Sequence, residues 1–458
     1  MIIAKYKFDK TIFENCMPIF NEDFADYTIT DNEENNIITR TIESDILPTK
    51  MTFGDNYSKL PSAQSLLEIL ELNTSAVENF EAMFGGCSNL TKINCLIDIY
   101  GETRGSLFRM FYNCSKLETL DLSNWDLSET EIYKLEELFS GCKSLKTIIL
   151  NNLRAVAPNS HSFTIEMDYM FADCESLESI DTTKITCSNH YYYMRGIFFN
   201  CKSLKTLDLS GWDFRGIDYI YDLFYGCESL ESIDMSNLIF DSLCSLSNMF
   251  NGCKSLKSVN FSNCVHIPSA RSYGFSEMDY MFNDCESLES IDLSFFNFEW
   301  LRTMEYAFNN CKALKTIKFP DQLNLHLVAY YNNAFENCSS LEELNFNKII
   351  KYDYEKYNWP IPDDKPPSCE NIIAGCTSLK KVSLKQCQDI GLINKIISSL
   401  NVRPVDDPGI LNLMHSPLTD VDINSAKQKN WKIYLRGQSR PIYTNTKICS
   451  KNSNITKN

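Results

Sequence analysis

One short sequence motif recurs eleven times along this chain of 458 residues, and a cysteine stands at the centre of each copy. The pattern is close to MF-x-x-C-x-S-L-x-x-I-D-L-S, as in MFNDCESLESIDLS at 281–294. A single copy is too short to bury an apolar face alone, so regular self-similarity of this kind indicates stacked repeats that share one continuous core. The central cysteines are Cys87, Cys114, Cys142, Cys174, Cys201, Cys227, Cys253, Cys285, Cys311, Cys338 and Cys376.

Each copy contains two segments in which the apolar residues are spaced differently. The apolar residues of MDYMFADC (167–174) are spaced i, i+3, i+4, i+7, which predicts a short helix with one buried face. The following segment, as in LETLDL (117–122), has the L-x-x-L-x-L pattern of a leucine-rich-repeat strand. We therefore expect an α/β repeat fold, a leucine-rich-repeat solenoid with a parallel sheet of about eleven strands that is capped at both ends.

The repeated cysteines have three explanations. A zinc site needs C-x-x-C pairs or Cys/His clusters, and no C-x-x-C occurs in the sequence. Disulfides need partners, whereas equivalent cysteines of stacked repeats point the same way. The explanation that we favour is a small apolar side chain in a narrow core. We therefore expect neither a metal nor another cofactor at these cysteines, and we predict that their thiols are free and buried.

Two positions in the repeat carry charges that alternate in sign from one copy to the next. We expect each charge to face opposite charges on neighbouring strands, so that a slip by one repeat would place like charges together. This arrangement predicts a structural role and no binding site. The residue after the first strand leucine runs Glu118, Lys146, Glu178, Lys205, Glu231, Lys257, Glu289, Lys315, Glu342, Lys380, and the residue after the cysteine runs Lys143, Glu175, Lys202, Glu228, Lys254, Glu286, Lys312.

A column of aspartates on the outward side of the predicted strands is a first candidate for ligand binding. Its neighbouring members Asp181, Asp208 and Asp234 should repel one another, so they could meet a basic ligand or a cation. The alternative is a solvated sheet face on which these carboxylates accept hydrogen bonds from nearby hydroxyl groups.

A proline-containing insertion at 351–368 is the second candidate, with the aromatic residues Tyr352, Tyr354, Tyr357 and Trp359. Exposed aromatic side chains on a stiff loop are common anchors for protein or sugar ligands. The alternative is that the loop folds these rings onto the last repeat.

The repeats occupy the middle of the chain, and different patterns flank them. We expect an N-terminal capping region at 1–75, the solenoid at 76–385, a C-terminal cap at 386–443 and a flexible tail at 444–458. MIIAKYKF and NNIITRTI predict strands, INKIISSL (393–400) predicts a helix, and AKQKNWKIYL (426–435) predicts a helix followed by a strand.

Charge and missing motifs narrow the function classes. The net charge of −17 repels nucleic acids and anionic membrane surfaces. Charged residues interrupt the N-terminal ten residues, and no apolar run reaches the ~20 residues of a membrane span, so we expect no signal peptide and no membrane insertion. The catalytic patterns G-x-x-x-x-G-K-[ST], G-x-S-x-G, G-x-G-x-x-G and H-E-x-x-H are absent. We therefore expect a binding protein and no enzyme.

The repeat, with WD after it in LSNWDLS and LSGWDFR, resembles the BspA-type leucine-rich repeats of bacterial surface proteins, Mycoplasma-like lipoproteins and Gram-positive phages. The leading segment, MIIAKYKFD…TRTIESDILPTKMTFG, is similar to the N-termini of repeat proteins in clostridial phages and prophages. These resemblances imply a tail-associated protein that binds a protein or glycan of the host surface. It would be attached to the virion through an end region and be found in virions or outside the cell after lysis. The alternatives are a bacterial surface adhesion or interaction module and a cytoplasmic scaffold.

Overall fold

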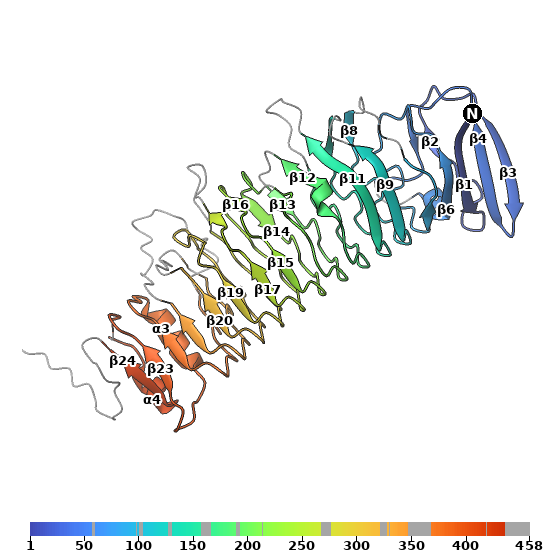
Figure 1. The fold of residues 1–458 in the computed structure, drawn as a ribbon. Coiled ribbons are helices and arrows are strands. Elements are labelled where there is room, and N and C mark those ends of the chain that lie inside the picture. Colours follow the sequence, from blue (N-terminus) through green and yellow to red (C-terminus); the bar gives the residue numbers. More distant parts are fainter. Residues whose placement is uncertain are drawn as a thin grey trace, which may run out of the picture.

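The computed structural model shows a long stack of repeats between an N-terminal sheet and a C-terminal sheet with two helices (Figure 1). It is a parallel-sheet solenoid of about eleven turns, so the predicted leucine-rich-repeat architecture is confirmed. In the described residues no helix is long and apolar enough to span a membrane. The structure describes residues 1–56, 60–97, 99, 104–126, 131–156, 166–188, 193–212, 214–266, 276–320, 328, 330–346, 368–417 and 419–435.

A mixed five-stranded sheet, in the order β3-β4-β1-β6-β7, stands at the N-terminal end. Strand β1 pairs antiparallel with β4 and β6, whereas β6 pairs parallel with β7 of the first repeat at Glu68 and Lys92. The end sheet therefore continues directly into the repeat ladder. The elements of this region are β1 (Ile2–Asp9), β2 (Ile19–Phe20), β3 (Thr28–Glu34), β4 (Ile37–Glu43), β5 (Met51–Thr52), α1 (Pro61–Ser65) and β6 (Leu66–Leu72).

The main ladder consists of short parallel strands that begin five residues after nine of the eleven repeat cysteines. Their side chains alternate between buried and exposed, as in β15, where Ile233 is buried between the exposed Ser232 and Asp234. The L-x-x-L-x-L pattern therefore forms strands as predicted. The main-ladder strands are β7 (Lys92–Ile93), β9 (Thr119–Asp126), β11 (Thr147–Val156), β15 (Ser232–Asp234), β17 (Ser258–Asn260), β19 (Ser290–Asp292), β20 (Thr316–Lys318), β21 (Glu343–Asn345) and β22 (Lys381–Ser383).

A second parallel ladder runs along the solenoid eight residues before each cysteine. Single-residue bridges continue it beyond the named strands, from Tyr219 through Ser245, Glu277, Thr303 and Tyr330 to Ser368. The strands of the second ladder are β8 (Arg104–Ser106), β10 (Glu131–Lys134), β13 (Tyr193–Arg195) and β14 (Tyr219–Tyr221). Further pairs after the main ladder involve β12 (Ile185–Ser188), which follows the 3-10 helix η1 (Thr182–Lys184), and β16 (Ile239–Phe240) with β18 (Val265–His266).

The short helix predicted for the segment before each cysteine is wrong, because this segment is a succession of tight turns. Alternate amides bond within the repeat, as Met110 N–H does to Leu107 O at 3.0 Å. The amides between them bond to the next repeat, as Phe111 N–H does to Leu138 O at 2.9 Å. The predicted helix face is buried nonetheless, since the turns direct the same residues inward.

Each turn segment contains left-handed residues that interrupt a helix, one five positions before the cysteine, such as Tyr169, and one directly before it. Only glycine adopts positive φ freely, and asparagine and aspartate tolerate it better than other residues. Every cysteine of the repeat follows one of these three types, so the sequence carries a signal against the helix. The positive-φ residues directly before the cysteines are Gly86, Asn113, Gly141, Asp173, Asn200, Gly226, Gly252, Asp284, Asn310, Asn337 and Gly375.

A column of parallel phenylalanine rings fills the core along the solenoid. Successive centroids lie 5.2–5.9 Å apart and the ring planes differ by only 2–14°. The column begins in the N-terminal region, so one stack joins that region to ten repeats. Its members are Phe53, Phe84, Phe111, Phe139, Phe171, Phe198, Phe224, Phe250, Phe282, Phe308 and Phe335.

The repeat cysteines lie beside this column, and all eleven are buried. From Cys114 onward each thiol donates to the backbone oxygen of the phenylalanine one repeat earlier, as Cys227 Sγ does to Phe198 O at 3.1 Å. Of the nineteen cysteines, seventeen are recorded in the structure as free thiols. Burial raises the pKa of Cys201 and Cys253 well above the ordinary value, which keeps these thiols protonated. The predicted free, buried thiols are therefore confirmed for the repeat.

Both alternating charge rows form ion pairs between neighbouring repeats. In the row after the cysteine, Glu175 contacts Lys143 at 2.9 Å and Lys202 at 2.8 Å. In the strand row, each glutamate reaches the lysine of the following repeat. Those distances are 3.0 Å for Glu118–Lys146, 3.0 Å for Glu178–Lys205, 2.8 Å for Glu231–Lys257, 3.1 Å for Glu289–Lys315 and 3.9 Å for Glu342–Lys380.

The C-terminal end closes with the parallel sheet β21-β22-β23-β24 and two helices. Asp389 precedes helix α3 as its N-cap, and its carboxylate accepts the Leu392 N–H at 2.9 Å. The helix predicted within 393–400 and the helix followed by a strand predicted within 426–435 are both present. The elements are α3 (Ile390–Ser399), β23 (Gly409–Asn412), α4 (Ile423–Gln428) and β24 (Trp431–Tyr434).

Candidate binding surface

The aromatic residues of the predicted loop, Tyr352, Tyr354, Tyr357 and Trp359, lie outside the described residues. Their role in ligand binding stays a prediction.

The aspartates of the main ladder accept hydrogen bonds from their own chain. Asp181 Oδ1 accepts the Thr183 N–H at 3.1 Å, and Asp208 Oδ1 accepts the Ser210 N–H at 2.8 Å. Asp234 does the same with Ser236, and these bonds lower the pKa of Asp234. Each carboxylate therefore stabilises the turn that follows it. This geometry matches the solvated-face alternative, and a ligand role for Asp181, Asp208 and Asp234 stays a prediction.

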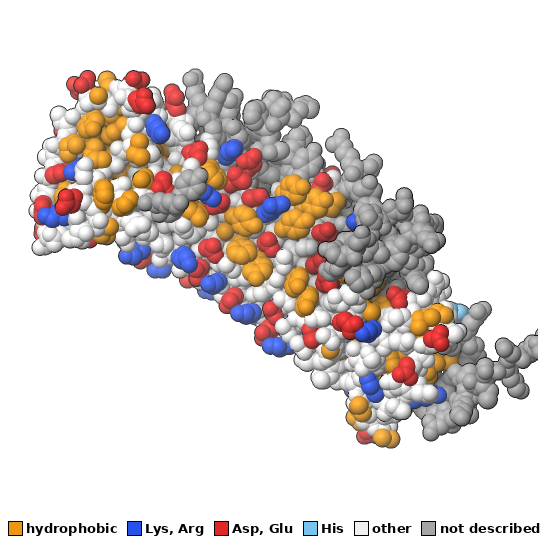
Figure 2. All heavy atoms as spheres, turned by 180° about the vertical axis from the view of Figure 1, so that it is seen from behind, with side chains coloured by type: hydrophobic (Ala, Val, Ile, Leu, Met, Phe, Trp, Pro, Cys, Tyr) orange, Lys and Arg blue, Asp and Glu red, His pale blue; other side chains and the backbone are white. Residues whose placement is uncertain are grey.

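A different surface gathers aromatic side chains, and we call it the turn face. It consists of the outward residues of the second ladder and of the turns that follow it, up to two residues before each cysteine. At its centre the residues Tyr169, Tyr193, Arg195, Phe199, Tyr219, Tyr221 and Tyr225 come from three successive repeats. Figure 2 shows hydrophobic side chains in patches along the middle of the solenoid, with charged side chains between them and an edge on which the two charges alternate.

The rings of the turn face stack on one another along the solenoid axis. Tyr193 and Tyr219 lie 5.1 Å apart at 14°, and Phe199 and Tyr225 lie 4.8 Å apart at 8°. The Tyr169 ring packs edge-on against Phe199. Each stacked pair covers one face of both of its rings, and the ring edges and the tyrosine hydroxyl groups remain for a partner.

A glycine makes room for one of these rings. Gly196 has φ +50°, and a Cβ there would lie 2.5 Å from Cε1 of Tyr169. The Tyr169 ring therefore lies directly against the backbone of the next repeat, which flattens the centre of the turn face.

Arg195 lies among these rings, and three carboxyl groups surround them. Its guanidinium is 5.0 Å from the centre of the Tyr193 ring and 5.9 Å from that of Tyr221, within the range of cation–π contacts. Burial raises the pKa values of Asp168 and Asp222. Burial, with the neighbouring Glu166 and Asp168, raises the pKa of Glu136 to about 7. These carboxyl groups are partly desolvated without full compensation by cations.

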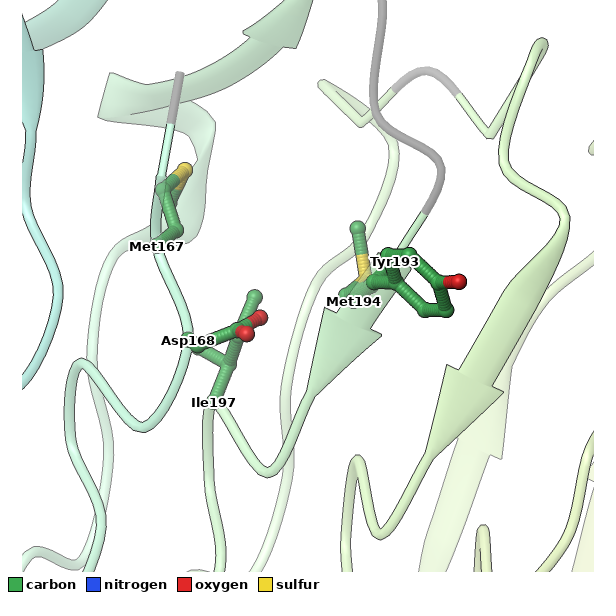
Figure 3. Close-up of a pocket in the computed structure, with 5 residues that line it drawn as sticks. All are labelled: Met167, Asp168, Tyr193, Met194 and Ile197. Carbon is green, nitrogen blue, oxygen red and sulfur yellow. The ribbon is translucent and has the colours of Figure 1, made fainter. Parts of the chain in front are cut away.

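A shallow depression marks the edge of this aromatic centre. It is open to solvent, and Met167, Met194 and Ile197 line it with Asp168 and Tyr193. In Figure 3 the Asp168 carboxylate extends from one repeat toward Tyr193 and Met194 of the next. Pockets that enclose a small molecule are larger, so the surface suits a flat contact better than a buried ligand.

Sequence reasoning missed the turn face because it concentrated on the strands and the insertions. The signal was present in YYYMRGIFF (191–199) and DYIYDLFYG (218–226), where aromatic residues exceed the one phenylalanine that the repeat requires. In the described residues no three His, Cys, Asp or Glu side chains are placed to hold a metal ion.

Two family models match the chain. One, described as the BspA type leucine rich repeat region (6 copies), matches residues 278–357. The other, described as a Mycoplasma protein of unknown function, DUF285, matches residues 61–152, 105–215 and 162–264. No curated protein matches the chain.

Several solved structures are similar to the chain at low identity. A leucine-rich repeat protein from Bacteroides ovatus is 16% identical, with 91% of this chain and 100% of that chain covered and a TM-score of 0.45. A leucine rich cell surface protein from Faecalibacterium prausnitzii is also 16% identical, with 58% and 73% covered and a TM-score of 0.24. Both TM-scores lie below 0.5, so the assignment depends on the repeats and the family models. The repeated motif and the family models therefore show that the chain carries leucine-rich repeats, with a match to the BspA type over residues 278–357.

Proposed function

We propose that the chain is a non-catalytic recognition protein that binds its partner through the turn face. The observation that carries the proposal is the cluster of tyrosines around Arg195 on a rigid scaffold, since tyrosine and arginine dominate the energetics of many interfaces. The tyrosines lose little conformational freedom on binding, because neighbouring rings already hold them in place. The repeat family points to the same class of function, a binding or adhesion role.

We further propose that the partner lies on a host cell surface and that the chain acts as a phage or prophage tail-associated protein, located in the virion. The resemblance of the N-terminal segment to clostridial phage proteins supports this assignment. The competing assignments are a bacterial surface adhesion module and a cytoplasmic scaffold. The neighbouring genes separate them, because tail and holin genes would support the phage assignment.

The proposal is tested by removing two rings from the turn face, the exposed Tyr193 and the half-buried Tyr225. Tyr193→Ala with Tyr225→Ala should weaken sedimentation of the purified chain with intact clostridial cells at least tenfold, while the melting temperature changes little. The matched control is Ile239→Ala with Val265→Ala, which removes exposed apolar side chains from a different strand pair. Attachment that survives in the tyrosine variant contradicts the proposed surface. The predicted loop residues Tyr354 and Trp359 are then the next to replace.

A further inference from the structure

We infer that the turn face takes a polypeptide carrying basic side chains, in preference to a sugar chain. This inference rests on the proposed function and specifies the chemistry of the partner. It follows from the orientation of the rings, from the balance of charges around them, and from an arginine of this chain that already occupies the same face.

The ring orientation disfavours a carbohydrate. A sugar ring binds an aromatic residue by stacking on its open face, but Tyr193 and Tyr219 cover one another at 5.1 Å, and Phe199 and Tyr225 do so at 4.8 Å. The Arg195 guanidinium also lies 5.0 Å from the centre of the Tyr193 ring. The ring edges and the phenolic groups are therefore what a partner meets. Burial raises the pKa of Tyr219 and raises that of Tyr221 to about 12, so both keep the proton that a hydrogen-bond donor needs.

The charge balance favours a cationic partner. Among the described residues, the carboxyl groups in and beside the aromatic centre outnumber the basic side chains. Lys134 is 3.8 Å from Glu166, and Arg195 lies over the tyrosine rings. The carboxyl groups are Glu136, Glu166, Asp168 and Asp222. Basic side chains of a partner would supply the missing positive charge, and the partly desolvated setting strengthens such pairs.

An internal arginine shows how a guanidinium fits this surface. Arg109 lies 4.7 Å from the centre of the Phe108 ring and 4.9 Å from that of Tyr112. Its Nε and Nη2 donate to the two carboxylate oxygens of Glu137 at 3.0 and 2.8 Å. Aromatic rings and a carboxylate of the turn face thus hold one guanidinium already, in the bidentate geometry that arginine favours. Three repeats after Glu137, the carboxylate of Asp222 lies among similar rings.

The test compares two double variants that remove the same charge from different faces. The first is Asp168→Asn with Asp222→Asn. An asparagine at position 168 still offers an oxygen to the Arg195 backbone N–H, and an asparagine at position 222 tolerates the positive φ there. The matched control is Asp181→Asn with Asp208→Asn on the main ladder. Its fold is preserved because Asn260 already makes the same turn bond in that column, to the Ser262 N–H at 3.0 Å.

The probes are an array of short unstructured peptides that carry arginine or lysine beside apolar residues, a matching array with glutamate in their place, and a glycan array. The wild-type chain and the control should bind a set of the basic peptides, and Asp168→Asn with Asp222→Asn should weaken that binding at least tenfold. Equal losses in both double variants would show unspecific attraction to an acidic protein and would overturn the inference.

Two further outcomes separate this inference from the proposed function. In the first, the chain binds glycans and no basic peptides, and Tyr193→Ala with Tyr225→Ala abolishes the glycan binding. This result would leave the turn face as the binding site and would refute a basic polypeptide as its partner. In the second, neither Asp168→Asn with Asp222→Asn nor Tyr193→Ala with Tyr225→Ala changes the binding. This result would refute the turn face as the binding site.

Discussion

The phenylalanine column makes a prediction that separates ring stacking from simple burial. Phe224 is fully buried and lies between two parallel rings, 5.7 Å from Phe198 and 5.5 Å from Phe250. Phe224→Leu keeps an apolar side chain there but removes both ring contacts. Stacked aromatic pairs contribute about 0.5–1.5 kcal/mol each beyond their buried area, so the two contacts together predict a loss of about 1–3 kcal/mol.

A double-mutant cycle isolates the stacking contribution from the change in volume. The neighbours Phe198→Leu and Phe224→Leu share one ring contact, so their combined effect should be smaller than the sum by about 0.5–1.5 kcal/mol. The pair Phe171→Leu and Phe224→Leu has a ring between its members and should be additive within about 0.5 kcal/mol. The free energy of unfolding would be measured by urea titration with far-ultraviolet circular dichroism.

Two results would refute this reasoning. Additivity for the neighbouring pair would show that the rings act only as apolar volume. Equal coupling for both pairs would show that the loss spreads through the repeats and does not arise at the shared contact.

Three further predictions follow from the structure. Glu231→Lys should lower the melting temperature more at low salt than at high salt, because it faces like charges at Lys205 and Lys257; an effect independent of salt would contradict an electrostatic ladder. Titration of thiols in denaturant should give the same count near nineteen with and without reductant, and a rise with reductant would reveal disulfides. Because burial and Glu166 raise the pKa of Glu136 to about 7 from 4.5, this carboxyl group should cost stability increasingly as pH rises between these values. Glu136→Gln should therefore melt above wild type at pH 8 and close to it at pH 4, and a difference of equal size at both pH values would exclude this origin.

The sequence predicts the repeat, its strands and its core, because each depends on a spacing that eleven copies repeat. The helix prediction failed since the inward positions of the turn segment, such as Met170, Phe171 and Cys174, have the spacing of a helix face. Only the backbone conformation distinguishes the succession of turns from a helix. The residue types before the cysteines, such as Asn200 and Gly226, report that conformation once positive φ is considered.

The turn face was harder to predict because its outward positions depend on the turns themselves. In a helix, Tyr193, Arg195 and Phe199 would point in different directions, so the excess of aromatic residues alone does not place them on one face. The stacks also need the register between repeats, which places Tyr193 beside Tyr219. The aspartate column could be located from the sequence, but the backbone bonds that engage Asp181 and Asp208 could not.

The alternating charges restrict how a gene for such a chain can change in length. Deletion of the repeat that contains Glu228 and Glu231 would bring Lys202 beside Lys254 and Lys205 beside Lys257. Deletion or duplication of two successive repeats leaves the alternation intact, so recombination preserves the ladder only in even steps. The distance between the aromatic centre and either end of the solenoid then changes in increments of about 10 Å, twice the strand spacing. Selection for a different distance between the aromatic centre and the ends of the solenoid would act on pairs of repeats. Single substitutions on the turn face would change which partner binds.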